Sequence, residues 1–291
     1  MKINGKTKGI ICIIAAAFGF SLMSVFVRLA GDLPSFQKAF FRNFIALIFM
    51  TGTLLKKKTG FLPRKENALY LVGRSLFGTI GIVCNFYAID RLVLADANML
   101  NKLSPFFAII FSALLLKEKP DIVQLCAVAA AFAGTVMIVK PGFTGMSFFP
   151  AAVGTLGGAG AGIAYTFVRK LGCRGEDSTK IIFWFSAFST AVCLGFMLIP
   201  GNFEKMSVRQ LLFMCLAGLC ACIGQFGITN AYIFAPAKEI SVYDYSQVVF
   251  AALLGFILFG QIPDILSILG YALICGAGIA MFFYNKRRTY S

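Results

Sequence analysis

Long apolar segments recur along almost the whole chain, and they constrain its fold more than any other feature. A transmembrane helix needs about 20 mainly apolar residues to cross roughly 30 Å of hydrocarbon. Short connections with Pro, Gly and Asp separate the apolar segments, as is typical of turns between helices. The sequence therefore predicts an all-α integral membrane protein of ten transmembrane helices, at residues 9–30, 35–55, 67–89, 93–116, 121–140, 148–170, 179–199, 207–234, 238–260 and 264–285.

The composition excludes several classes of soluble protein. Hydrophobic residues make up 59% of the chain and charged residues 13%, against about 25% charged residues in a soluble domain. The chain has no histidine, and its nine cysteines form no CxxC pair, so neither a zinc site nor a disulfide framework is indicated. We therefore expect no enzyme, no catalytic residue, no metal site and no cofactor.

The net charge of +15 is distributed over short connections between apolar segments, so we expect no nucleic-acid partner. Most of the 27 Lys and Arg residues lie in segments that would share one side of the membrane with the N-terminus. Basic connections stay in the cytoplasm. The sequence therefore predicts a multi-pass protein of the cytoplasmic membrane with both termini in the cytoplasm.

The two halves of the chain resemble each other. Residues 26–31 align with residues 167–172, and residues 108–121 align with residues 251–264. Each half would hold five spans, and because five is odd the second half would be inserted in the opposite sense. Inverted repeats of this kind are typical of secondary transporters, while duplication without transport is the alternative. We expect two five-helix repeats, at residues 1–143 and 144–291.

The Pro-Asp pairs after the fourth and ninth spans and the run Tyr243–Gly255 make the chain similar to the EamA branch of the drug/metabolite transporter superfamily. Asp244 stands where the family usually has Glu. The resemblance implies a helix-only carrier in which spans 1–4 and 6–9 line a central cavity. Spans 5 and 10 would be peripheral, as the candidate interface of a homodimer. Relatives carry S-adenosylmethionine, amino acids, riboflavin or organic anions.

Two polar stripes occupy corresponding positions in the two halves. In the fourth span, Asn98, Asn101 and Lys102 share one helical face with Pro105. Asp244 of the ninth span corresponds to Asn101 in this alignment. We expect Lys102 and Asp244 to flank the substrate or to pair with each other in its absence, and Asp244 is the candidate for proton coupling. A purely structural ion pair is the alternative.

Two further cations lie within predicted spans, Arg42 in the second and Arg74 in the third. Arg74 shares a helical face with Gly78, Gly81 and Asn85, which predicts a groove of small residues beside its side chain. Charged side chains inside a membrane usually face a cavity or a partner. We expect surplus positive charge to select a carboxylate on the substrate; snorkelling of both arginines to the headgroups is the alternative.

Aromatic rings with a polar group and amide side chains complete the predicted site. The amides have a second interpretation, as contacts between helices that need no substrate. The predicted substrate-binding residues are Arg42, Arg74, Asn98, Asn101, Lys102, Tyr165, Trp184, Gln225, Asn230, Tyr243, Asp244, Tyr245 and Gln247.

Together these features predict a secondary active transporter that works by alternating access. Its substrate would be a small polar metabolite bearing a carboxylate, such as an organic anion, an amino acid or an S-adenosylmethionine-like compound. Membrane lipids are the other expected partners. A carrier that exports lipophilic cations and drugs is one alternative, and a non-transporting membrane scaffold is another.

Overall fold

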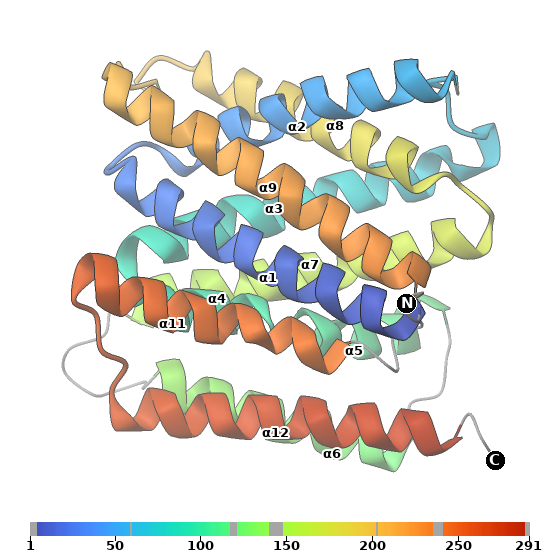
Figure 1. Ribbon diagram of the computed structural model, residues 1–291, viewed down its shortest axis with the longest axis vertical. Helices are drawn as coiled ribbons and strands as arrows, with labels where there is room; N and C mark the ends of the chain where they lie inside the picture. Colours follow the sequence, from blue (N-terminus) through green and yellow to red (C-terminus); the bar gives the residue numbers. More distant parts are fainter. Residues whose placement is uncertain are drawn as a thin grey trace.

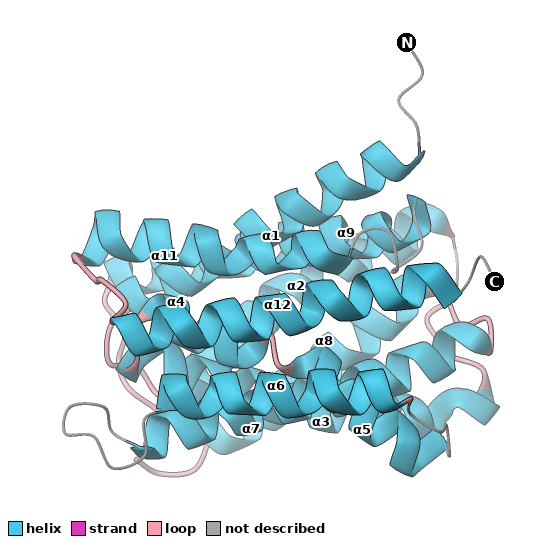
Figure 2. Ribbon diagram, turned by 90° about the horizontal axis from the view of Figure 1, so that it is seen from below, coloured by secondary structure: helices cyan, strands magenta, loops and turns pink. Residues whose placement is uncertain are grey.

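The computed structural model describes residues 5–58, 60–116, 121–139, 148–201, 203–234 and 241–288. Within these ranges all regular elements are helices (Figure 2). They are α1 (Gly5–Leu29), α2 (Ser35–Lys57), η1 (Lys65–Asn67), α3 (Ala68–Arg91), α4 (Leu94–Asn101), α5 (Ser104–Leu116), α6 (Ile122–Val139), α7 (Phe148–Cys173), α8 (Ser178–Met197), α9 (Val208–Phe234), η2 (Ser241–Tyr245), α11 (Ser246–Phe259) and α12 (Ile265–Arg288).

These helices confirm the predicted all-α membrane fold. Seven of them are long and apolar enough to cross a membrane, and two shorter apolar helices cover Ile122–Ile138 and Tyr243–Phe259. The remaining predicted span consists of α4 and α5 together. The predicted boundary between the halves, at residues 143 and 144, lies outside the described residues.

The helices lie side by side, and both termini are found at the same end of the bundle (Figure 1). Helices of the first half pack on helices of the second: α1 on α9, α3 on α7, α2 on α8 and α6 on α12. The first helix of each half thus packs on the third helix of the other half. Two inverted repeats related by a two-fold axis produce this exchange.

Glycines on α7 allow it to approach its neighbours closely. A Cβ added at Gly158 would lie 2.5 Å from the carbonyl oxygen of Leu100, and one at Gly160 would lie 2.9 Å from that of Phe77. No side chain fits between these backbones, so α7 contacts α3 and α4 directly. Small residues have this role at the interfaces of membrane helices.

The prediction of one continuous helix over residues 93–116 is wrong. The chain turns at Lys102 and Leu103, between α4 and α5. Pro105 lacks an N–H donor, and its ring would clash with the Asn101 carbonyl if the helix continued, whereas proline is tolerated in the first turn of a new helix. In the second half, the 3₁₀ turn η2 likewise precedes α11. The break and the 3₁₀ turn place Lys102 and Asp244 opposite each other.

Candidate functional site

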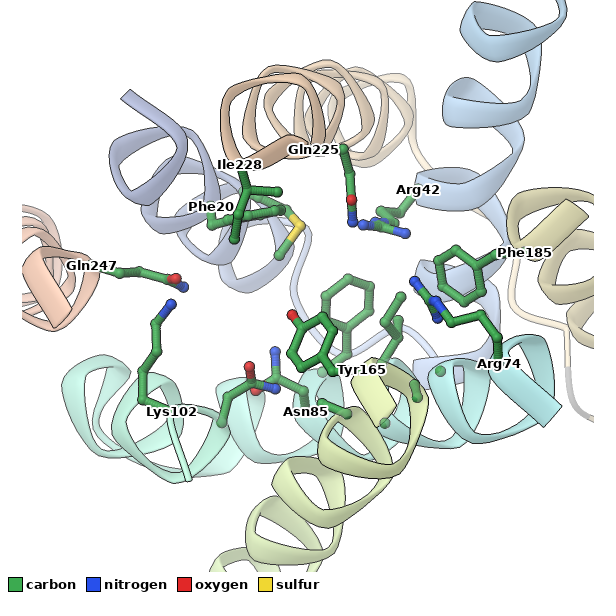
Figure 3. Close-up of a pocket in the computed structure, with 18 residues that line it drawn as sticks. Phe20, Arg42, Arg74, Asn85, Lys102, Tyr165, Phe185, Gln225, Ile228 and Gln247 are labelled. Carbon is green, nitrogen blue, oxygen red and sulfur yellow. The ribbon is translucent and has the colours of Figure 1, made fainter. Parts of the chain in front are cut away.

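A cavity lies inside the bundle, lined by residues of both halves (Figure 3). Its volume is about 100 Å³, less than the ~300 Å³ at the lower end of the range for ligand pockets. Side chains must therefore move apart before a metabolite can enter. Charged and amide side chains face it from several helices, among them Arg42, Arg74, Asn85, Lys102, Gln225 and Gln247.

Arg42 and Arg74 meet at one side of this cavity, beside the ring of Phe185 from α8 (Figure 3). The guanidinium carbon lies 4.1 Å from the ring centroid for Arg74 and 5.8 Å for Arg42, within the range of cation–π contacts. Only 3% of Arg42 and 7% of Arg74 is exposed, which argues against snorkelling. Gly78 provides the predicted small-residue groove, because a Cβ there would collide with both Arg74 and Phe185.

The two guanidinium groups are only partly satisfied. Arg42 Nη1 donates to Asn43 Oδ1 over 2.6 Å, while the Nε of each arginine is buried without a hydrogen-bond partner. The ion pairs found among the described residues are Lys38–Asp90 and Lys102–Asp244, so neither arginine has a carboxylate partner there. This side of the cavity therefore carries two buried positive charges with free donor capacity, which suits a carboxylate.

Lys102 and Asp244 pair directly. Lys102 Nζ lies 2.6 Å from Asp244 Oδ2, with 9% and 19% of the two side chains exposed. The second carboxylate oxygen, Oδ1, is buried without a hydrogen-bond partner. This contact joins the break between α4 and α5 to η2, and so joins the first half to the second.

A hydrogen-bond network lies beside this ion pair. The Oδ1 atom of Asn98 accepts from Gln247 Nε2 over 2.7 Å and from Ser24 Oγ over 3.2 Å. Ser21 Oγ in turn donates to the Gln247 carbonyl over 2.9 Å. The network holds α1, α4 and α11 together, so Asn98 fixes the positions of neighbouring helices.

The structure brings most of the predicted site residues together. Asn98 and Asp244 adjoin the lining through the contacts above. Seven others line the cavity itself: Arg42, Arg74, Asn101, Lys102, Tyr165, Gln225 and Gln247.

The other four predicted residues are also absent from the cavity lining. Trp184 Nε1 donates to the Phe61 carbonyl over 3.0 Å, near the end of the bundle that carries the termini. Tyr243 is 38% exposed, Tyr245 contacts α12 at Gly278, and Asn230 lies toward the end of α9. Aromatic rings with a polar group also occur at membrane interfaces and between helices. Such a side chain in the sequence therefore does not by itself indicate a cavity residue.

The chain matches the model of the EamA-like transporter family twice, over residues 7–140 and 149–284. The chain belongs to the EamA-like transporter family. It is 32% identical to the pseudopaline exporter CntI of Pseudomonas aeruginosa over 94% of this chain and 95% of the relative. It is 25% identical to a riboflavin transporter of Rhizobium johnstonii, over 96% of this chain and 92% of that protein.

A solved crystal structure supports the fold of this EamA-like chain. The two superpose with a TM-score of 0.66 at 16% identity, over 97% of this chain and 98% of the other. Membership of the family and the apolar helices together make the chain a multi-pass membrane protein, and the relatives that it matches are named transporters.

Several lining residues of this EamA-like protein stand outside the predicted set, among them Asn85 and Phe185. Asn85 Oδ1 is buried without a hydrogen-bond partner, and its place on the helical face of Arg74 was the signal that could have added it. Phe185 is one of 32 phenylalanines, and no local pattern distinguishes it. Only its contacts with two guanidinium groups identify it.

Polar contacts also join the two halves at both ends of the bundle. Away from the termini, Gln37 exchanges two hydrogen bonds with the backbone of Glu204, and Gln210 donates to the Ala30 carbonyl over 3.0 Å. At the other end, Asn67 Nδ2 donates to Glu176 Oε2 over 2.7 Å. These contacts would have to open in turn if the halves moved against each other.

Proposed function

We propose that this chain is a secondary active transporter that carries a small carboxylate-bearing metabolite across the cytoplasmic membrane by alternating access. The observation that carries the proposal is the pair Arg42 and Arg74, which faces one cavity without a carboxylate partner among the described residues. A charge inside a membrane is costly, and a bound carboxylate would offset that cost with charge-assisted hydrogen bonds.

The Lys102–Asp244 pair supplies the second set of charges. A substrate carboxylate would compete with Asp244 for Lys102, and a substrate ammonium group would compete with Lys102 for Asp244. An amino-acid-like group suits both. Protonation of Asp244 would also release Lys102, so this carboxylate is our candidate for proton coupling.

The family supports transport without deciding the substrate. The relatives are named for different substrates, pseudopaline and riboflavin, so we infer the substrate class from the charge of the cavity. Repeats inserted in opposite senses would open the cavity to each side in turn. The excess of Lys and Arg on the side of the termini supports a cytoplasmic position for that end of the bundle. We propose residues 1–143 and 144–291 as the two repeats.

Export of lipophilic cations is the second candidate, because Phe20, Phe86, Tyr165 and Phe185 place aromatic rings in the lining. Arg42 and Arg74, which lack a carboxylate partner among the described residues, argue against this candidate because their positive charges would repel a cation.

A thermal-unfolding screen of the purified protein separates the two candidates. The ligands are amino acids, di- and tricarboxylates, S-adenosylmethionine, pseudopaline, riboflavin and lipophilic cations. A ligand at 100 times its Kd stabilises the folded state by about 2.7 kcal/mol. We expect stabilisation by one carboxylate class, and saturable uptake of that compound into proteoliposomes. Stabilisation by lipophilic cations alone would overturn the proposal, and no stabilisation by any ligand would support a scaffold.

A further inference from the structure

An apolar groove lies between α3 and α8 on the outside of the bundle, apart from the central cavity. Its volume is about 480 Å³, and it is formed by Leu62, Leu71 and Val72 on one side and Trp184, Phe188 and Ala191 on the other. Val72 is 51% exposed and Leu62 is 78% exposed, so the groove opens away from the bundle interior. It has room for a segment of one acyl chain.

Trp184 marks the depth of this groove in the membrane. It is the only tryptophan of the chain, and its Nε1 donates to the Phe61 carbonyl of the connection between α2 and α3. Tryptophan is enriched where hydrocarbon meets the headgroups. The groove therefore starts at headgroup level and runs along α8 toward the middle of the bilayer.

Two cations lie at the headgroup end of the groove. Lys180 Nζ donates over 3.1 Å to the carbonyl of Leu62, which lines the groove. Arg64 follows the lining residue Pro63, and its Nη1 donates over 3.1 Å to the Arg174 carbonyl. Each contact uses one donor, whereas a lysine has three and an arginine five. Both cations therefore keep donors for a phosphate.

The acids in this region are largely engaged elsewhere. Glu176 Oε2 accepts from Asn67 and from the Arg64 backbone, and Asp177 caps α8; Glu66 is exposed. Basic residues outnumber these three acids: they are Lys56, Lys57, Lys58, Arg64, Lys65, Arg174 and Lys180. The end of the groove is therefore electropositive.

We propose that this groove binds an anionic phospholipid, with one acyl chain between α3 and α8 and the phosphate on Arg64 and Lys180. Lipid tails are as apolar as the groove, so its apolar lining alone does not select a lipid. The charge of the headgroup selects the lipid instead, because each cation near the surface raises the affinity for an anionic lipid roughly fivefold. Because α3 belongs to the first half and α8 to the second, the bound lipid bridges the halves.

Native mass spectrometry of the delipidated full chain tests this site. The probes are phosphatidylglycerol, phosphatidylcholine with the same acyl chains, and soluble glycerol phosphate. We expect the chain to bind phosphatidylglycerol more tightly than phosphatidylcholine by at least about fivefold. Arg64→Gln and Lys180→Gln should each remove roughly fivefold of that preference. They should weaken phosphatidylcholine binding less, because its choline cation offsets the charge of its phosphate. Ala191→Trp, which fills the groove, should weaken binding of both lipids.

Matched controls use positions away from the groove. Lys205→Gln removes an exposed cation from the opposite end of the bundle, and Ala129→Trp enlarges an exposed alanine on α6; we expect lipid binding to be unchanged in both. Equal binding of the two lipids would overturn the proposal. So would equal binding of glycerol phosphate and phosphatidylglycerol, which indicates a site for free phosphate, or equal losses in the control variants.

Discussion

Lys102 and Asp244 lie 142 positions apart in the sequence, and their side chains meet at 2.6 Å inside the bundle. The break between α4 and α5 carries one partner, and η2 carries the other. Each residue is thus held where the backbone is not a regular α-helix. In transporters of this kind, substrate and coupling-ion sites form at such interrupted helices.

Removing one member of this pair should destabilise the protein. An unpaired buried charge costs about 3 kcal/mol, so we expect Lys102→Gln and Asp244→Asn each to lower the free energy of unfolding by that amount. The double variant should regain most of the stability but not the transport activity. Chemical denaturation and proteoliposome uptake measure the two effects. Recovery of transport in the double variant would show that the ion pair is only structural.

Neutralising either cavity arginine should weaken binding of an anionic substrate. A hydrogen bond to a charged group contributes about 1.5–3 kcal/mol, so Arg42→Gln and Arg74→Gln should each raise its Kd roughly tenfold to 100-fold. Arg209→Gln removes an exposed cation at the start of α9 and should leave the Kd unchanged. Calorimetric titration measures it, and wild-type affinity in both cavity variants would reject the arginine pair as the substrate site.

The close contact of α7 should make Gly158→Ala destabilising. The new Cβ would lie 2.5 Å from a backbone oxygen of Leu100, which can move only together with α4, and overpacking of this kind costs about 1–3 kcal/mol. Gly172 lies on the same helix with open space around it. We expect Gly172→Ala to be neutral or slightly stabilising, since alanine favours helix by up to about 1 kcal/mol. Thermal unfolding in detergent compares the two, and equal effects would contradict the packing argument.

Asp177 should make stability sensitive to acid. Burial raises the pKa of its carboxyl, but hydrogen bonds from the Thr179 and Lys180 backbone lower the pKa by a larger amount. The net pKa therefore lies below the usual value. A depressed pKa means that its stabilisation is present above the unfolded-state value of about 3.9. That stabilisation is lost as the pH falls through the lower folded-state pKa.

Loss of this cap should be measurable at neutral pH. Asp177→Ala removes the side-chain acceptor at the start of α8 and should cost about 1 kcal/mol. Asp177→Asn keeps an acceptor and should retain most of the stability without the acid-dependent step. Unfolding measured from pH 7 down to about pH 2 compares them, and an identical acid response in all three proteins would exclude this carboxyl as its source.

The sequence by itself determined the number of spans and the division into repeated halves. It also predicted the pairing of Lys102 with Asp244, as one of two expected outcomes. Hydropathy is averaged over about 20 consecutive residues, so the sequence alone is enough to locate a span. An internal repeat likewise shows which positions of the two halves correspond, without a three-dimensional structure. Even the break at Lys102 has a local cause in Pro105, although the apolar pattern by itself predicts one continuous helix.

The tertiary structure alone decided which side chains share the cavity. Arg42, Arg74 and Phe185 come from three helices, and their meeting depends on the rotation and depth of each helix. Those quantities follow from packing between helices, such as the glycine contacts of α7, which no single segment specifies. For the same reason Trp184, which resembled a cavity residue in sequence, lies instead beside an apolar groove at the end of the bundle.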